Sequence, residues 1–447
     1  MAFPDVAVQP EYRSHVVLGL GATGLSVVRY LCKKRVIPIV MDSRNNPPGS
    51  ARLALDFPDV ELISGGFDCR YIVQATQIII SPGIPVSTPE VRVALDMGIE
   101  VVGDVELFAR EMAQLPPKVL GITGSNGKTT VTTLVGLMAE ADNKKVAVGG
   151  NIGVPVLDLL ADNFDLYVLE LSSFQLETTQ SLNCIAATCL NISEDHMDRY
   201  HDLSAYREAK MRLYEQTHLS IFNRNDEATC PSEPGNFESF GLNEPVADGW
   251  GLRDSHLVHG ETDIMPISDV GLMGNHNLSN LLAAMSLADA AGISKFAMIK
   301  VATEFTGLSH RFEKIGTYNQ VIYINDSKAT NVGSTAAALT GLEGFSGRVI
   351  LIAGGDGKGA NFKELESLLK NVEQLITLGR DGDKIAVLKE GSIKVKTMMD
   401  AVKAAMEIAE AGDLILLSPA CASLDMYSNY MARGDDFRHC VETLNAL

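Results

Sequence analysis

The sequence is poor in the features that mark membrane and secreted proteins. Its 447 residues contain no apolar run of the length needed to cross a bilayer. The segment Met1–Asp5 lacks the basic and then apolar layout of a secretory signal peptide. Cysteine occurs seven times, without a Cys-x-x-Cys pair, which argues against a disulfide framework or a zinc site. We therefore expect a cytoplasmic protein with reduced thiols.

Positive charge is also scarce. Lysine and arginine number 37 against 56 aspartates and glutamates, which gives a net charge of -19. Nucleic-acid binding is led by Lys and Arg contacts to phosphate, so this balance argues against a nucleic-acid partner. It does not exclude a small anionic ligand, because one local basic cluster is enough to hold it.

Short apolar strands alternate with helical segments along the chain, which predicts an α/β protein with parallel sheets covered by helices. The length exceeds what one hydrophobic core usually supports. We expect three domains, over residues 1–107, 108–307 and 308–447. The stretch 225–266 is polar, interrupted by Gly and Pro, and weakly periodic, so no fold is predicted for it.

A glycine-rich loop, Gly121–Thr130 (GITGSNGKTT), lies between an apolar strand and a helical pattern that begins near Val131. Such a turn aims backbone N–H groups and a helix N-terminus at phosphates. Lys128 would reach the β and γ phosphates, and the Thr129 hydroxyl could ligate Mg²⁺. Ile122 stands where the usual pattern has its first glycine. We call this segment the phosphate loop.

A second glycine turn, Gly19–Gly24 (GLGATG), follows the first strand, and Asp42 ends the next one. This is the pattern of dinucleotide-binding folds. Arg44 follows closely, and an arginine there suits a phosphate better than a bare ribose. The turn Ser81–Ile84 ends another strand at the same sheet edge. A nucleotide-sugar, a redox dinucleotide and a turn that serves only packing all remain open.

Two strand ends in the second expected domain carry polar groups. Glu170 ends an apolar strand beside the phosphate loop, where it could bind a metal, orient a water or simply cap a helix. The cluster Asn191–Arg199 (NISEDHMDR) contains His196, whose contact with metal or phosphate is as open as a structural role. Lys210 lies in a predicted helix, and its surroundings in the sequence indicate only a solvated lysine.

The third expected domain begins near Arg311. This arginine could clamp a phosphate across a domain cleft or form a structural ion pair. Three strand ends follow. Asn325–Asn331 (NDSKATN) carries an aspartate and a lysine suited to a ribose and a substrate carboxylate. Gly354–Lys358 is another glycine turn, and Ser418–Asp425 closes the last apolar strand.

The motifs together resemble those of the Mur ligases, the ATP-dependent amide ligases of bacterial peptidoglycan synthesis. The resemblance covers essentially the whole chain, and Ile122 matches that family's version of the phosphate loop. It implies a Rossmann-like N-terminal domain, a P-loop ATPase-like central domain and a Rossmann-like C-terminal domain. The motifs that carry it are Thr123–Thr130, Glu170–Phe174, Glu194–Arg199, and Gly274–Asn277 with Asn280.

Within the family, Asn325–Asn331 and Ser418–Asp425 resemble the members that add D-glutamate to UDP-N-acetylmuramoyl-L-alanine. The resemblance implies an acyl-phosphate mechanism that uses ATP and Mg²⁺, and we expect a monomer. Another Mur-type or folylpolyglutamate-type amide ligase is the alternative enzyme. A P-loop nucleotide-binding switch is the alternative without ligase activity.

The resemblance also assigns roles to single residues. Catalysis would involve Lys128, His196 and Lys210, the last as a carbamate. ATP would contact Gly124, Ser125, Asn126, Gly127, Lys128, Thr129, Thr130, Asn277, Arg311 and Asp326. The UDP-substrate would contact Gly21, Ala22, Thr23, Ser43, Arg44, Ser81, Asn151 and His196. D-Glutamate would contact Lys328, Thr330, Lys358, Ser423 and Leu424. Metal ligands would be Thr129, Glu170, His196 and Lys210.

Overall fold

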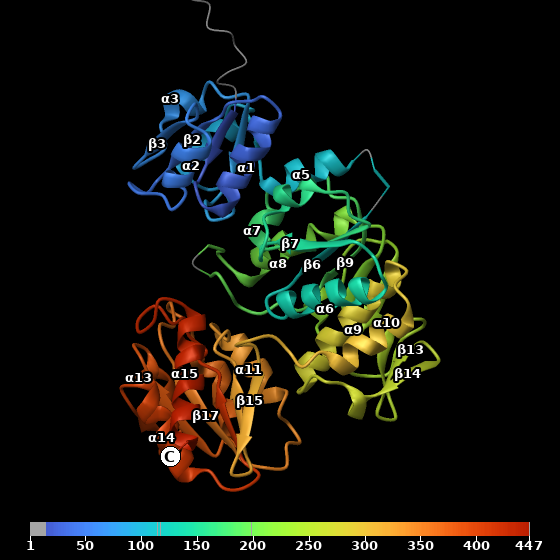
Figure 1. Cartoon of the computed structure of the whole chain (residues 1–447), viewed down its shortest axis with the longest axis vertical. Helices are drawn as coiled ribbons and strands as arrows, with labels where there is room; N and C mark the ends of the chain where they lie inside the picture. Colours follow the sequence, from blue (N-terminus) through green and yellow to red (C-terminus); the bar gives the residue numbers. More distant parts are fainter. Residues whose placement is uncertain (1–14, 114, 117, 198, 447) are drawn as a thin grey trace, which may run out of the picture.

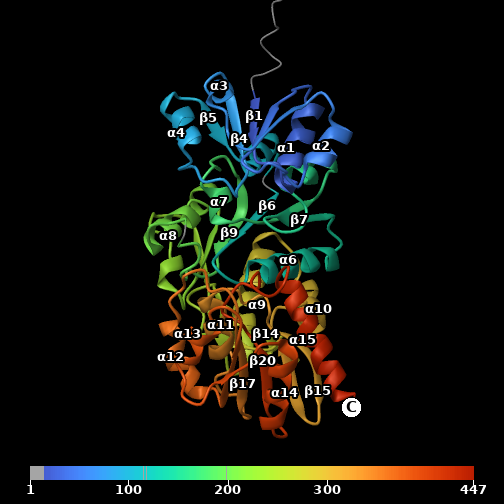
Figure 2. The same ribbon diagram turned by 90° about the vertical axis from the view of Figure 1, so that its left-hand side faces the viewer.

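The computed structural model describes residues 15–446 except 114, 117 and 198. It confirms the expected class: the described chain forms three α/β domains, each built on its own sheet. The domains follow one another along the long axis of the molecule, with the middle domain between the other two (Figures 1 and 2).

The N-terminal sheet has five parallel strands in the order β3-β2-β1-β4-β5. Its three central strands each carry three consecutive apolar residues, as expected for a sheet covered by helices on both faces. The strands are β1 His15–Leu18, β2 Ile39–Asp42, β3 Glu61–Ser64, β4 Gln77–Ile80 and β5 Glu100–Val102. The helices are α1 Ala22–Lys33, α2 Ser50–Asp56, α3 Cys69–Ile72 and α4 Pro89–Asp96.

The middle sheet has nine strands in the order β14-β13-β12-β11-β10-β9-β6-β8-β7. The seven from β12 to β7 are parallel to one another, whereas β13 pairs antiparallel with both β12 and β14. The stretch 225–266 thus extends the sheet. The strands are β6 Val119–Thr123, β7 Val146–Gly150, β8 Leu166–Glu170, β9 Cys184–Cys189, β10 Ser220–Asn223, β11 Phe237–Phe240, β12 Trp250–Arg253, β13 His256–His259 and β14 Thr262–Pro266.

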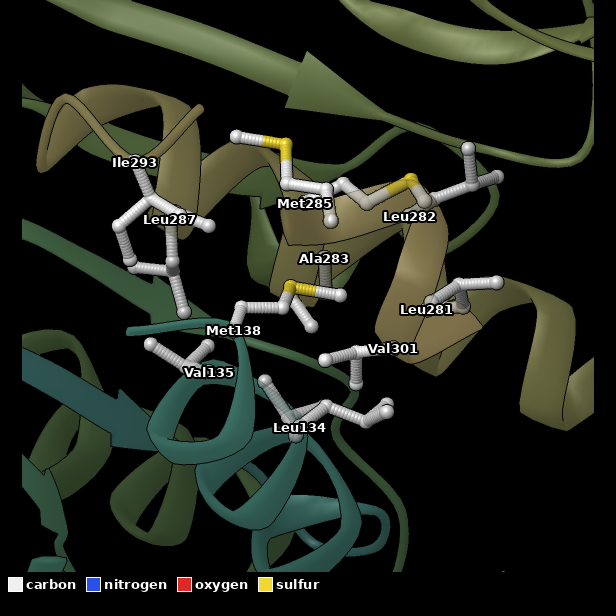
Figure 3. Close-up of a cluster of buried hydrophobic side chains, with 14 of the residues drawn as sticks. Leu134, Val135, Met138, Leu281, Leu282, Ala283, Met285, Leu287, Ile293 and Val301 are labelled. Atoms are coloured by element: carbon white, nitrogen blue, oxygen red, sulfur yellow. The ribbon is translucent and has the colours of Figure 1, made fainter. Parts of the chain in front are cut away.

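The helix that follows the phosphate loop, α6 (Lys128–Ala141), packs against α9 (Asn275–Ala290) and α10 (Lys295–Glu304). Figure 3 shows the apolar side chains of the three helices facing one another. This packing fixes α9, which carries the Gly274–Asn277 motif, against the loop. The residues labelled in Figure 3 are Leu134, Val135, Met138, Leu281, Leu282, Ala283, Met285, Leu287, Ile293 and Val301. Two shorter helices of this domain are α7 Ser173–Leu176 and α8 Leu203–Met211.

The C-terminal sheet has six strands in the order β15-β16-β20-β17-β18-β19, with only β15 antiparallel to its neighbour. Because β16, β20 and β17 are adjacent and parallel, the loops that follow them meet at one sheet edge. The strands are β15 Glu313–Tyr318, β16 Val321–Asn325, β17 Val349–Gly354, β18 Gln374–Leu378, β19 Ile393–Lys394 and β20 Leu414–Leu417. The helices are α11 Val332–Thr340, α12 Leu365–Leu368, α13 Gly382–Ala386, α14 Met398–Ile408 and α15 Tyr430–Asn445.

Helix α5 (Asp104–Met112) joins the first two domains. The buried Glu106 carboxylate accepts hydrogen bonds from the backbone N–H groups of Gln180 (2.7 Å) and Ser181 (3.0 Å) in the middle domain. The expected boundaries after residues 107 and 307 stay predictions, and the first falls within α5. No helix in the described part of the chain is long and apolar enough to cross a membrane.

Candidate active site

The phosphate loop is the turn between β6 and α6. Gly124 and Gly127 have φ of 141° and 83°, a backbone region that side chains rarely adopt. A Cβ added at Gly127 would lie 2.3 Å from Oδ1 of Asn280 on α9. The backbone conformation therefore favours glycine at residue 127, and a larger residue there would displace the Asn280 side chain.

Lys128, the first residue of α6, folds back over the loop. Its Nζ donates to the carbonyl oxygens of Gly124 (2.7 Å) and Ser125 (2.9 Å). Burial lowers the pKa of the Lys128 ammonium, with Glu170 and Asp195 acting in the opposite direction. Lys128 lines a cavity of about 520 Å³ between the middle and C-terminal domains, which we call the central cavity.

Thr129 lies at the centre of a hydrogen-bonded group on the wall of this cavity. Its Oγ1 donates to Oε2 of Glu170 (2.8 Å) and accepts from Nη2 of Arg311 (2.7 Å). Asn151 Nδ2 donates to the other Glu170 oxygen (2.8 Å). Glu170 is only 2% exposed, so these partners offset the cost of burying its charge.

The Thr129 and Glu170 oxygens suit Mg²⁺, which is commonly held by one or two carboxylates together with substrate phosphates and water. Among residues 15–446, apart from the three gaps, no three His, Cys, Asp or Glu side chains gather closely enough to hold a metal ion. A cation at this position would therefore complete its shell with ligand oxygens and water.

Lys210 and His196 both lie near the Tyr206 ring, but they differ in their access to the central cavity. Lys210 is 2% exposed, and its Nζ donates to the Gly124 carbonyl (2.9 Å), which Lys128 also contacts. Burial, and then the charge of Lys128, lower the pKa of Lys210 to about 7. His196 lines the central cavity, whereas Lys210 does not; the imidazole packs edge-on to the Phe174 ring at 4.8 Å.

The C-terminal domain supplies charged groups to the opposite wall. Asp326 accepts from Ser418 Oγ (2.8 Å) and from the Phe312 N–H (3.1 Å), and burial raises its pKa to about 7. The Lys328 Nζ lies 4.5 Å from the centroid of the Tyr430 ring. Burial, and then Arg311, lower the pKa of Lys328 to about 8. The remaining expected contacts that line the cavity are Ser125, Asn126, Gly127, Thr130, Asn277, Thr330 and Lys358.

Ser423 and Leu424 do not line the central cavity. Ser423 is buried, and Leu424 is 70% exposed. Their loop nevertheless lies beside the glycine turn that carries Lys358, because Asp356 and Ala422 exchange two backbone hydrogen bonds of 2.9 and 2.8 Å. A contact between these two residues and an amino-acid substrate stays a prediction.

A second cavity, of about 420 Å³, lies at the edge of the N-terminal sheet; we call it the N-terminal cavity. Middle-domain residues complete its wall, and Asn151 lines both cavities. His196 is the one expected UDP-substrate contact that lines only the central cavity. The others all line the N-terminal cavity: Gly21, Ala22, Thr23, Ser43, Arg44, Ser81 and Asn151.

Asp42 is engaged within the N-terminal domain. Its carboxylate accepts from the Leu20 N–H (2.8 Å), the Arg44 N–H (2.9 Å) and the Arg44 guanidinium (2.6 Å from Nη2). The Arg44 hydrogen bonds hold the pKa of Asp42 at about 2. Asp42 thus holds the Arg44 guanidinium through Nε and Nη2, and both residues line the N-terminal cavity.

One residue at the domain interface, Ser334, lies outside every motif recognised in the sequence, and the contacts across this interface were not predicted. Asn331 caps α11 by accepting from the Ser334 N–H (2.8 Å), and the Ser334 hydroxyl donates to Asn126 Oδ1 of the phosphate loop (2.6 Å). Asn331 Nδ2 also donates to Asp195 (3.2 Å). The Asn-x-x-Ser spacing signals a helix start. No signal in the sequence pairs these residues with partners more than 130 positions away.

Three protein-family domain models match successive parts of the chain. Residues 13–103 match the Mur ligase MurD-like N-terminal domain, 122–288 the Mur ligase middle domain, and 310–421 the Mur ligase glutamate ligase domain. The chain belongs to the Mur ligase family.

Curated relatives within this family are similar to the chain over its whole length. A UDP-N-acetylmuramoylalanine--D-glutamate ligase of Shewanella oneidensis is 66% identical over 438 residues, covering 98% of this chain and 100% of the relative. A ligase of the same name from Hahella chejuensis is 47% identical and covers 97% and 98%. The MurF ligase of Thermotoga maritima, solved in complex with ADP, shares the fold with a TM-score of 0.61 at 14% identity, and the match covers 98% of each chain.

Proposed function

We infer that this protein is a UDP-N-acetylmuramoylalanine--D-glutamate ligase, which uses ATP to join D-glutamate to UDP-N-acetylmuramoyl-L-alanine. The observation that carries this inference is the pair of cavities that share Asn151. One is built for a nucleotide at the N-terminal sheet, and the other combines a phosphate loop with cations of the C-terminal domain. Relatives of that name match the whole length of the chain.

The proposed reaction has two steps, formation of an acyl phosphate and formation of the amide. The alanyl carboxylate of the UDP-substrate attacks the γ-phosphorus of ATP, which forms an acyl phosphate and releases ADP. The D-glutamate amine then attacks the acyl carbon, loses a proton, and phosphate leaves as the amide forms. Charge on the transferring phosphoryl group is the main barrier, so we assign its neutralisation to Lys128, Arg311 and the backbone N–H groups of the loop.

Thr129 and Glu170 are the proposed holders of Mg²⁺. When bound, Mg²⁺ would neutralise phosphate charge and orient the phosphoryl group. His196 and Lys210, the latter as a carbamate, are the proposed second set of ligands. In the described structure Lys210 donates to Gly124, so modification would replace a donor with an acceptor at that position.

Substrate contacts are assigned according to the cavity that each residue lines or lies beside. Asn277 and Asp326 are proposed to hold ATP, with Asp326 at the ribose. Arg44 and Ser81 would bind the diphosphate of the UDP-substrate in the N-terminal cavity. Proposed contacts of D-glutamate are Lys328, Thr330, Lys358, Ser423 and Leu424. We also propose that the enzyme acts as a cytoplasmic monomer.

A coupled phosphate assay tests the proposal. We expect phosphate release only when ATP, UDP-N-acetylmuramoyl-L-alanine and D-glutamate are all present. Release with folate and L-glutamate, or with another amino acid in place of D-glutamate, would indicate a different amide ligase. Slow ATP hydrolysis that neither acceptor nor amino acid stimulates would indicate a P-loop switch.

A further inference from the structure

Arg199 ends the Glu194–Arg199 motif, and the function proposed above gives it no role. Its side chain is 11% exposed and crosses from the middle domain to the N-terminal domain. Nη1 donates to the carbonyl oxygen of Pro82 (3.0 Å), and Nη2 makes a longer contact with that of Ile84 (3.5 Å). These two carbonyls belong to the Ser81–Ile84 turn, which lines the N-terminal cavity.

The same guanidinium is fixed within the middle domain. Nη2 pairs with Oε2 of Glu177 (2.9 Å), and the guanidinium carbon lies 4.1 Å from the centroid of the Phe174 ring. Stacking on an aromatic face and an ion pair together hold the planar group in one orientation. The Phe174 ring in turn contacts His196, which lines the central cavity.

The Ser81–Ile84 turn does not depend on Arg199 for its shape. The Ser81 N–H donates to the Leu18 carbonyl (2.9 Å), and the Ser81 hydroxyl donates to the Gly19 carbonyl (3.2 Å). The Ile84 N–H closes the turn on the Ser81 carbonyl (2.9 Å). Since these bonds lie within the N-terminal domain, what Arg199 adds is the placement of the turn relative to the middle domain.

We propose that Arg199 is a positioning residue that fixes the N-terminal cavity relative to His196 and the phosphate loop. This inference rests on the proposed function, in which an acceptor held in one cavity must present its carboxylate to a phosphate in the other. A small displacement of reacting groups reduces the rate of such a step steeply, even when each ligand still binds.

The test is Arg199→Met in the full chain, which keeps a long apolar side chain against Phe174 and removes the donors. We expect kcat for three-substrate phosphate release to fall about tenfold or more, the size expected for losing hydrogen bonds from a charged donor. The affinity for UDP alone, measured by calorimetry, and the KM for ATP should stay within about twofold of wild type. Arg199→Lys can keep the Glu177 pair and one carbonyl contact, and should recover part of kcat.

Arg207→Met is the matched control. Arg207 also donates to two backbone carbonyls, those of Ala228 (2.7 Å) and Cys230 (2.8 Å), but both lie in its own domain. Its kcat should remain within about twofold of wild type. Unchanged kcat in Arg199→Met, an equal loss in Arg207→Met, or a parallel loss of UDP affinity would overturn the inference. Wild-type protein that binds no UDP or releases no phosphate would instead refute the proposed function.

Discussion

Two lysines converge on one backbone oxygen of the phosphate loop. The ammonium groups of Lys128 and Lys210 both donate to the Gly124 carbonyl, at 2.7 and 2.9 Å. Burial, and then the like charge of Lys128, disfavour protonation and lower the pKa of Lys210 to about 7. Near neutral pH a substantial share of the Lys210 amine therefore carries the free electron pair that addition to CO₂ requires.

Replacing Lys210 by alanine tests its proposed carbamate. We expect Lys210→Ala to lose activity by orders of magnitude and to regain part of it in acetate, whose carboxylate can occupy the vacated space. Lys328→Ala is the control, since that lysine is assigned to the amino-acid substrate and acetate should not rescue it. The measurement is phosphate release with and without acetate; if neither acetate nor depletion of bicarbonate has any effect, the carbamate assignment fails.

The second prediction concerns glycine at residue 127. In Gly127→Ala the new Cβ meets Asn280 Oδ1 at 2.3 Å in a backbone conformation with φ of 83°. We expect ATP affinity to fall at least tenfold, because either the loop or the Asn280 side chain, which also lines the central cavity, must move to relieve the clash. Gly98→Ala is the control: its φ is 75°, but no atom lies within 4 Å of the added Cβ. That variant should lose about 1 kcal/mol of stability and no ATP affinity. Equal ATP affinities in calorimetry would contradict this role of residue 127.

Arg44 offers a third prediction. Arg44→Ala should raise the KM for the UDP-substrate at least tenfold and leave the KM for ATP within about twofold, because Arg44 lines only the N-terminal cavity. Arg70→Ala is a close control. Arg70 pairs with Asp68 two residues earlier, as Arg44 pairs with Asp42, but lies outside that cavity. Steady-state kinetics in which both KM values change equally would count against the assigned site.

At the scale of elements, strands made of continuous apolar residues were predicted well. The strand expected before Gly19–Gly24 is β1, and the apolar strand expected before Ser418–Asp425 is β20. Both could be recognised from their apolar residues alone, because a strand buried on both faces carries a continuous apolar run. The stretch 225–266 could not be predicted. Its strands have four or five residues and lie toward the edge of the sheet, where neighbouring strands supply the pairing that the local pattern does not specify.

Helix α5 leads to a prediction about pH. Asp104, its first residue, is 1% exposed, and burial raises its pKa from 3.8 to about 6. Between these values the unfolded chain binds fewer protons at this group than the folded chain, so its contribution to stability falls as the pH rises. The loss reaches about 3 kcal/mol above pH 6.

The Asp104→Asn variant has no carboxyl group to titrate at this position. Comparing it with wild type therefore isolates the effect of Asp104 protonation on stability. The melting temperature of Asp104→Asn should rise relative to wild type as the pH increases from 4 to 6, and the difference should then level off. Calorimetric scans at several pH values measure it. A difference that stays constant across this range, or one that shrinks, would show that Asp104 is ionised in the folded protein throughout.

At the scale of the molecule, the site depends on contacts that only the tertiary structure provides. The motifs at Gly121–Thr130 and Gly19–Gly24 could be recognised from the sequence because each is a local strand–turn–helix unit. The hydrogen bond from Ser334 to Asn126 could not be, because it joins two domains 208 residues apart in the chain. The same holds for the hydrogen bond from Arg311 to Thr129, although the sequence did indicate that Arg311 lies at a domain junction.

The domain contact between Ser334 and Asn126 can be measured by a double-mutant cycle. Ser334→Ala and Asn126→Ala should each lower kcat/KM for ATP, and the double variant should lose less than the sum. We expect a coupling of about 1 kcal/mol, the size of one hydrogen bond between neutral groups. Additive losses would mean that the two residues do not contact each other when the enzyme turns over.

Asn151 lies in the wall of both cavities, and this shared wall has a consequence for inhibition. Under the proposed assignment of the two cavities, a compound that joins a uridine diphosphate to an ATP-like group by a linker passing Asn151 would occupy both sites and lose its translational freedom only once. Its second half would bind at the high effective concentration set by the linker, so its affinity should exceed that of either half by a factor of 100 or more, on the order expected for matched bivalent ligands. The linked compound would bind a protein with only one such pocket no more tightly than the matching half does. The shared wall at Asn151 therefore offers selectivity as well as affinity.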